Sequence, residues 1–203
     1  MKPTRREKLA HLDAALAHVK SFRLAVDVGA HVGLWTKVLA ERFDAVIAFE
    51  PFLPNVERFE KNVQASNVLL SVSALGDREG MAYLTFEEKS RRSESMGSHS
   101  KHFVTWEEPA KRLDAGHVVT RTLDSFELQS LDFLKVDTEG ADTLVLRGAE
   151  ETLQRCRPVV IVESIAKYET RYGLQPGAPV DFLESLGAKC VANMWHDYIC
   201  VFP

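Results

Sequence analysis

The sequence predicts an α/β fold in which helices cover both faces of a mostly parallel β-sheet. Short apolar runs alternate with segments of helical periodicity along most of the 203-residue chain, which is the pattern of repeated βαβ units. These runs are apolar at nearly every position, as expected of strands that are buried on both faces. Hydrophobic residues make up 45% of the chain and charged residues 27%, which is typical of a globular protein. No linker divides the chain, so we expect a single domain over residues 1–203.

The first half of the chain begins with a helix and continues with strands and helices in turn. Leu9, Leu12, Leu16 and Val19 recur at spacings of three and four, which predicts an amphipathic helix over residues 5–20. The next elements are predicted as strands over 24–28, 45–49 and 68–74, helices over 32–42 and 54–65, and an extra strand over 80–86.

The segment 87–116 interrupts this alternation. It begins with six charged residues among eight, and it has no clear periodicity. A segment of this kind is either a functional lid, here over a substrate, or a disordered stretch.

The alternation resumes in the second half of the chain. The predicted elements are strands over 118–122, 131–137, 159–163, 189–193 and 198–202, and a helix over 180–186. The connection between the last two strands is short, so these strands must be antiparallel. We therefore expect a mostly parallel seven-stranded sheet with an antiparallel C-terminal strand.

Charge, cysteine content and hydropathy exclude several classes of protein. The net charge of -4 gives no electrostatic reason to expect a nucleic-acid partner. Cys156, Cys190 and Cys200 are odd in number and lack C-x-x-C spacing, so we expect reduced thiols. The N-terminus has no apolar signal region, and no apolar run approaches the ~18 residues of a membrane span. We expect a cytoplasmic protein that does not enter a membrane.

A glycine turn follows the first predicted strand, in Val26-Asp27-Val28-Gly29-Ala30-His31-Val32-Gly33. Gly29 and Gly33 would let a ligand approach the backbone at the carboxyl end of the strand. Asp27 is placed to accept a hydrogen bond from an ammonium group, directly or through water. His31 stands where the dinucleotide motif G-x-G-x-x-G has its second glycine, which lets a pyrophosphate approach. The turn therefore fits S-adenosylmethionine, which has no pyrophosphate, better than NAD.

A second motif, Phe49-Glu50-Pro51-Phe52, ends the next strand. Its glutamate lies 21 positions after Gly29. A carboxylate there can bind both hydroxyls of a cofactor ribose, with the proline and second phenylalanine beside the adenine. Ser73 and Ala74 are predicted to form the other wall of the adenine slot, and Asp77 either binds the adenine amino group or caps a turn. Each acid alone can also be a simple cap, but two acids at adjacent strand ends indicate a ligand site.

These segments resemble the FkbM-type methyltransferases, and the resemblance extends over residues 24–163. It is carried as well by Ala74-Leu75-Gly76-Asp77, Thr122-Leu123-Asp124-Ser125-Phe126, Leu134-Lys135-Val136-Asp137-Thr138-Glu139-Gly140-Ala141-Asp142, Leu146-Arg147-Gly148-Ala149 and the strand from Pro158 to Glu163. The sequence departs from the family pattern at Asp142, where glutamate is usual, and over 87–116, which has no recognisable counterpart.

The resemblance implies a class I methyltransferase fold of the Rossmann-like kind, with S-adenosylmethionine as cofactor. It implies that Asp27, Gly29, Gly33 and Glu50 bind this cofactor and that Asp137 faces the site of methyl transfer. Many members O-methylate hydroxyls on sugars, polyketides or other natural products.

Three residues are candidates for the reaction itself. Asp137 ends a strand expected beside the first one, where it would act as a base, orient the acceptor or hold the following turn. Glu163 ends the next strand and either contacts substrate or is an ordinary strand-end acid. His102 lies in the long insertion, and its side-chain type titrates near neutrality, as a base requires. His99 and Trp106 share that segment, where solvated loop positions are the commoner outcome.

Other polar residues have two interpretations. Glu139 holds the turn after Asp137 or binds the amino-acid end of the cofactor. The loop between the last two strands either walls the acceptor pocket or is a plain turn; it contains Asn193, Trp195, His196 and Asp197. Asp137, Glu139 and Asp142 need not converge around a strand-to-helix turn, so we expect no metal site.

We therefore expect an enzyme that O-methylates a hydroxyl of a small-molecule or carbohydrate acceptor. One alternative is a methyltransferase of nucleic acid or protein, although the N-P-P-Y-type motif of DNA enzymes is missing at 137–140. The others are an NAD-type oxidoreductase and a non-catalytic binding module that retains the fold. The N-terminal helix can pack on its own sheet or on a second subunit, so the sequence is compatible with an oligomer.

Overall fold

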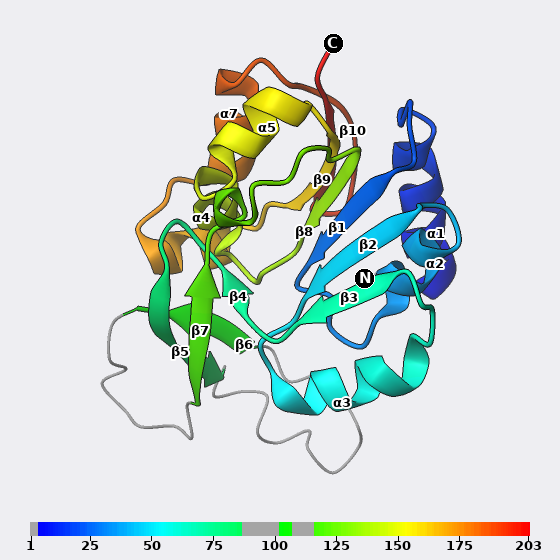
Figure 1. The fold of residues 1–203 in the computed structure, drawn as a ribbon. Coiled ribbons are helices and arrows are strands. Elements are labelled where there is room, and N and C mark those ends of the chain that lie inside the picture. Colours follow the sequence, from blue (N-terminus) through cyan, green and yellow to red (C-terminus); the bar gives the residue numbers. More distant parts are fainter. Residues whose placement is uncertain (1–3, 87–101, 107–115) are drawn as a thin grey trace.

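A computed structural model describes residues 4–86, 102–106 and 116–203 (Figure 1). Its larger sheet consists of β1 (Leu24–Val28), β2 (Ala45–Phe49), β3 (Val68–Ser71), β8 (Phe133–Val136), β9 (Val159–Glu163), β10 (Lys189–Met194) and β11 (Asp197–Val201). The strand order is β10-β11-β9-β8-β1-β2-β3, and β11 runs antiparallel to both of its neighbours. The pairs from β9 to β3 are parallel. The predicted seven-stranded sheet with its antiparallel C-terminal strand is confirmed.

Helices pack on both faces of this sheet. They are α1 (Arg5–Leu16), α2 (Leu34–Ala40), α3 (Leu53–Asn62), α4 (Asp142–Arg147), α5 (Glu150–Cys156), α6 (Ala166–Glu169) and α7 (Ala178–Ser185), with short 3₁₀ turns η2 (Asp124–Phe126) and η3 (Thr170–Tyr172). Leu12 of α1 and Leu39 of α2 are buried against one face, while Leu146 of α4 and Leu183 of α7 are buried against the other. Apolar residues thus occupy both faces of each central strand, which is why the strands show no alternation of apolar and polar residues.

The N-terminal helix is shorter than its periodicity predicts. Thr4 and Glu7 form a capping box that fixes its start. After Leu16 the amides of His18 and Val19 bond to carbonyls three residues earlier, so the helix ends in a tightened turn. The chain then crosses to β1, which excludes the predicted extension to residue 20.

A second sheet, which the sequence did not predict, lies beside the first. It consists of β4 (Ala74–Leu75), β5 (Gly80–Phe86), β6 (His102–Thr105) and β7 (His117–Arg121), in the order β4-β7-β5-β6. The prediction of one strand over 68–74 is therefore wrong, because the chain leaves the main sheet after Ser71 and Ala74 pairs with Thr120 of β7. The strand expected at 118–122 belongs to this second sheet. Part of the predicted lid forms β6, which pairs with β5, while 87–101 and 107–115 lie outside the described residues.

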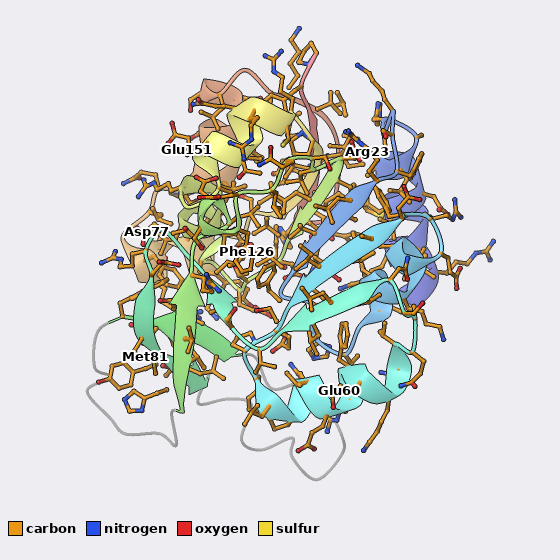
Figure 2. The ribbon with its side chains drawn as sticks, viewed as in Figure 1. Arg23, Glu60, Asp77, Met81, Phe126 and Glu151 are labelled. Carbon is orange, nitrogen blue, oxygen red and sulfur yellow. The ribbon has the colours of Figure 1, made fainter. Side chains whose placement is uncertain are left out.

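The two sheets meet at a close contact between glycines. A Cβ atom added to Gly148, at the end of α4, would lie 1.9 Å from the carbonyl oxygen of Gly76, which follows β4. Phe126 lies at the same junction (Figure 2), with its ring 5.2 Å from that of Phe49 in β2 and 4.6 Å from the guanidinium of Arg121 in β7. These contacts fix the position of the second sheet against the first.

Candidate active site

A cavity of about 710 Å³ lies at the carboxyl ends of β1, β2, β8 and β9. Its volume is within the range of small-molecule sites. It lies where β1 adjoins β8, the point from which the parallel strands proceed in opposite directions, as ligand sites in open α/β sheets do. The predicted site residues in its wall are Gly29, Ala30, His31, Glu50, Pro51, Ser73, Ala74, Asp137, Glu139, Glu163, Trp195, His196 and Asp197.

The two glycines of the turn are required by packing within the protein. Gly29 has φ 73°, and a Cβ atom there would lie 2.0 Å from the carbonyl oxygen of Asp137. Gly33 has φ 84°, and its Cβ atom would lie 2.4 Å from Cγ2 of Val63. Both positions thus combine a left-handed backbone with a close neighbour. This differs from the expected reason, the approach of a ligand, and Gly33 is not part of the cavity wall.

Asp27 is fully buried beneath the turn and is not part of the cavity wall. Its Oδ2 accepts a hydrogen bond of 2.6 Å from the Thr36 hydroxyl, and its Oδ1 lies 3.1 Å from the Lys135 ammonium. The structure therefore places the carboxylate among groups of the protein itself, not at the ligand-facing position expected from the sequence.

Lys135, to which the sequence analysis gave no role, lies at the centre of this network. It is directly opposite Asp27 in the β1–β8 pairing. Its ammonium donates to the carbonyls of Val28 at 3.2 Å and Gly29 at 2.7 Å, and it lies 3.8 Å from Oδ2 of Asp137. Burial alone would lower its pKa, but the nearby carboxylates outweigh burial and raise it. A lysine within an apolar strand was the available signal, since lysine is rarely buried without a partner.

Glu50 joins the glycine turn to the loop after β2. Its Oε2 accepts from the amide of His31 at 2.8 Å, and its Oε1 accepts from the amide of Phe52 at 3.0 Å and from the side-chain amide of Asn55 at 3.4 Å. Burial raises the pKa of Glu50, and these hydrogen bonds act in the opposite direction. Phe52 packs against the core of the second sheet and is not in the cavity wall, whereas Asn55, which was not predicted, is.

At the opposite side of the cavity, carboxylates lie in a row across three strands. Val136 pairs with Val162, so the next residues, Asp137 and Glu163, are neighbours, and Glu163 pairs with Asp197 of β11. Burial, followed by the charge of Asp137, raises the pKa of Glu163 to about 10 and that of Asp197 to about 6. Glu163 therefore holds its proton near neutral pH, and a cationic ligand at this wall would favour the ionised form of these acids.

The turn after Asp137 is held by Asp142, to which the sequence analysis gave no role. Oδ1 and Oδ2 of Asp142 accept from the amides of Thr138 at 2.9 Å and Gly140 at 3.0 Å. Burial, with a smaller contribution from Asp137, raises the pKa of Asp142 to about 7. The shorter acid is thus accommodated within its own turn. Glu139 lies in the cavity wall.

An aromatic wall closes another side of the cavity. It includes Phe103 from β6 and Tyr168 from α6. The Arg171 guanidinium lies 3.8 Å from the centre of the Phe103 ring, and the Tyr172 hydroxyl donates to the Val104 carbonyl at 2.7 Å. These contacts attach β6, from the segment predicted as a lid, to the segment after β9.

The remaining candidates lie away from the cavity or outside the described atoms. Asp77 pairs with Arg78 at 2.9 Å, and Trp106 stacks with the same arginine; neither is in the cavity wall. The side chain of His102 and the whole of His99 are not described. Over 4–86, 102–106 and 116–203, no group of three or more histidine, cysteine or acidic residues is arranged to hold a metal ion. None of the helices in these ranges is long and apolar enough to cross a membrane.

Comparison with known proteins assigns the fold and the family. The structure resembles Methyltransferase FkbM from Methylobacillus flagellatus KT, with a TM-score of 0.55 and 15% identity over 90% of this chain and 44% of that one. It also resembles the N-methyltransferase NodS from Bradyrhizobium japonicum WM9, solved with S-adenosyl-L-homocysteine, with a TM-score of 0.52 and 8% identity over 97% of this chain and 84% of that one. The fold is that of the class I methyltransferases.

The sequence itself matches the family described as the methyltransferase FkbM domain over residues 27–190. The chain belongs to this family. It is 28% identical over 145 residues to Methyltransferase 1 of Beauveria bassiana (strain ARSEF 2860), a match that covers 62% of this chain. The chain spans only 58% of the length of that relative.

Proposed function

We propose that this protein is an S-adenosylmethionine-dependent methyltransferase that O-methylates a hydroxyl of a sugar or small natural product. One observation carries the proposal: a single cavity connects the Gly29–His31 turn and Glu50 with the carboxylates of Asp137 and Glu163. The Gly29–His31 turn and Glu50 suit the nucleoside part of the cofactor. Asp137 and Glu163 suit its cationic and reacting end. Family membership and the match of NodS, whose structure contains S-adenosyl-L-homocysteine, support the cofactor.

The residues present fit this cofactor in their chemistry. Glu50 supplies carboxylate oxygens at the cavity wall for the two ribose hydroxyls, and Ala30, Pro51 and Ala74 supply apolar surface. Asp137 and Asp197 at the other side complement a sulfonium and an ammonium group, since opposite charges within a few ångströms stabilise each other in a partly buried site. A bound cation would also favour the ionised form of Glu163, which holds its proton near neutral pH in the empty cavity. The bound cofactor supplies a methyl group as an electrophile.

The protein's own task is to position the acceptor and receive its proton. Asp137 is one-third exposed in the cavity wall, so its carboxylate can accept a hydrogen bond from an acceptor hydroxyl. Alignment of the reacting groups can account for ~7–11 kcal/mol of barrier lowering, and a base for ~10²–10⁴-fold in rate. The aromatic wall formed by Phe103 and Tyr168 offers apolar surface for the face of a sugar or ring.

Titration calorimetry with S-adenosylhomocysteine tests the cofactor assignment, with NAD as the control ligand. We expect micromolar binding of S-adenosylhomocysteine and none of NAD. Glu50→Gln should weaken binding by about tenfold or more, because hydrogen bonds to a charged group contribute ~1.5–3 kcal/mol. Glu60→Gln, an exposed acid on α3, should leave affinity unchanged. Folded protein that binds neither ligand would support the non-catalytic alternative.

The role of Asp137 is tested with an acceptor identified by screening sugars and glycosides. Asp137→Ala should abolish turnover, while S-adenosylhomocysteine still binds through the nucleoside site at Glu50 with at most a moderate loss of affinity, since the ammonium group of the ligand loses one of several acidic neighbours. Turnover by this variant at the rate of the wild type would end the assignment of Asp137.

A further inference from the structure

Among the lysines and arginines whose side chains the structure describes, Lys135 is the one that is buried. Its four polar neighbours come from β1, from the turn that follows β1 and from the turn that follows β8. Three of these neighbours, Val28, Gly29 and Asp137, lie in the cavity wall, as Lys135 itself does. The Gly29 carbonyl is part of the turn proposed to hold the cofactor, and the Asp137 carboxylate is proposed to face the acceptor. A structural ion pair with Asp27 alone would not require either contact.

The other polar groups of the glycine turn are already bonded on its opposite side. The amides of Gly29 and Ala30 both donate to the Phe49 carbonyl at 3.0 Å, and the amide of His31 donates to Glu50. The Lys135 ammonium is bonded to the carbonyl of the same Gly29–Ala30 peptide. That peptide is therefore hydrogen-bonded on both sides: its amide donates to the Phe49 carbonyl of β2, and its carbonyl accepts from Lys135 of β8.

We propose that Lys135 is a positioning residue that sets the Gly29 turn and the Asp137 carboxylate relative to each other through one buried ammonium group. It contacts neither acceptor nor cofactor directly in this role, and its effect passes through those two groups. The inference rests on the proposed function in one respect, the identity of the ligand that binds at the turn. The rigidity of the turn is a property of the protein alone.

The test compares variants in which the buried charge of Asp27 has already been removed. Lys135→Met alone would leave Asp27 charged and unpaired, which typically destabilises a protein by ~3–5 kcal/mol and risks unfolding. We therefore compare Asp27→Asn, which keeps the lysine, with the double variant Asp27→Asn/Lys135→Met. Any difference in amide exchange or ligand affinity between these two variants then comes from the loss of the lysine.

The first measurement is amide hydrogen exchange of Ala30 and His31. In the double variant these amides should exchange at least about tenfold faster than in Asp27→Asn, because the peptide has lost a charge-assisted bond of ~1.5–3 kcal/mol. Amides of β2 and β9 should exchange equally in both variants. A uniform change in all three regions would mean a merely structural role and would overturn the proposal.

The second measurement is the affinity for S-adenosylhomocysteine, which should be at least about tenfold weaker in the double variant than in Asp27→Asn. Equal exchange and equal affinity in the two variants would overturn the proposal. If the wild type does not bind S-adenosylhomocysteine, the proposed function fails, while the exchange comparison still decides the role of Lys135.

Discussion

At the scale of single residues, Glu163 combines a strand-end position in the cavity wall with a strongly altered ionisation. Its pKa is raised from 4.5 to about 10, first by burial and then by neighbouring carboxylates. Between these two values the folded protein keeps a proton that the unfolded chain has lost. Stability therefore falls as the pH rises through this window.

Glu163→Gln should remove this dependence on pH. We expect the variant to be more stable than the wild type at pH 8 by at least about 1 kcal/mol, with the difference vanishing near pH 4.5. Urea denaturation at a series of pH values measures it, and Glu60→Gln serves as a control because that residue points into solvent from α3 (Figure 2). If the free energy of unfolding of wild type and variant changed with pH in parallel, the raised pKa of Glu163 would be contradicted.

The sequence could predict those site residues that depend on strand ends. Glu50, Asp137 and Glu163 each follow an apolar run, so their position at one edge of a parallel sheet could be inferred from the pattern. Lys135 and Asp142 could not be assigned in the same way. The role of Lys135 depends on its register opposite Asp27, and that of Asp142 on the path of a turn.

At the scale of elements, the junction between the two sheets depends on the absence of a side chain at Gly148. Gly148 has an ordinary backbone conformation, so its requirement is steric: a Cβ atom would collide with the Gly76 carbonyl. Gly148→Ala should lower the free energy of unfolding by about 3 kcal/mol, at the upper end of overpacking costs.

Thermal or urea denaturation measures this loss. Gly116→Ala is the matched control, because a Cβ atom there would have no neighbour within 4 Å. We expect its stability to stay within about 0.5 kcal/mol of the wild type. An equal effect of the two substitutions would show that the junction tolerates a side chain.

The alternation of strands and helices could be predicted where pairing is sequential, as for β1, β2 and β3. The second sheet could not, because its strands pair over long distances in the chain. Ala74 of β4 pairs with Thr120 of β7, and nothing in the local sequence of either strand indicates that partner. Secondary structure at 80–86 and 118–122 was therefore predicted correctly while the sheet to which these strands belong was not.

At the scale of the whole molecule, the cavity draws on more of the chain than the family segment. That segment begins at residue 27, yet Lys8 of α1 is in the cavity wall and its charge partly offsets the raised pKa of Asp197. α1 also buries Leu12 against the same face as α2. The N-terminal helix is thus part of both the core and the site.

The pairing of β4 with β7 has a consequence for how members of this family can diversify. Residues 74 and 120 are neighbours in space, so the chain between them leaves and re-enters the molecule through a closed base. The described part of this stretch contributes Leu84, Phe103 and Val104 to the cavity wall. Exchange of this stretch between relatives would therefore change the cavity wall while the β4–β7 pair is kept, and that pair marks where a graft should be cut. Such a graft would also have to keep the contacts of Phe103 and Val104 with Arg171 and Tyr172.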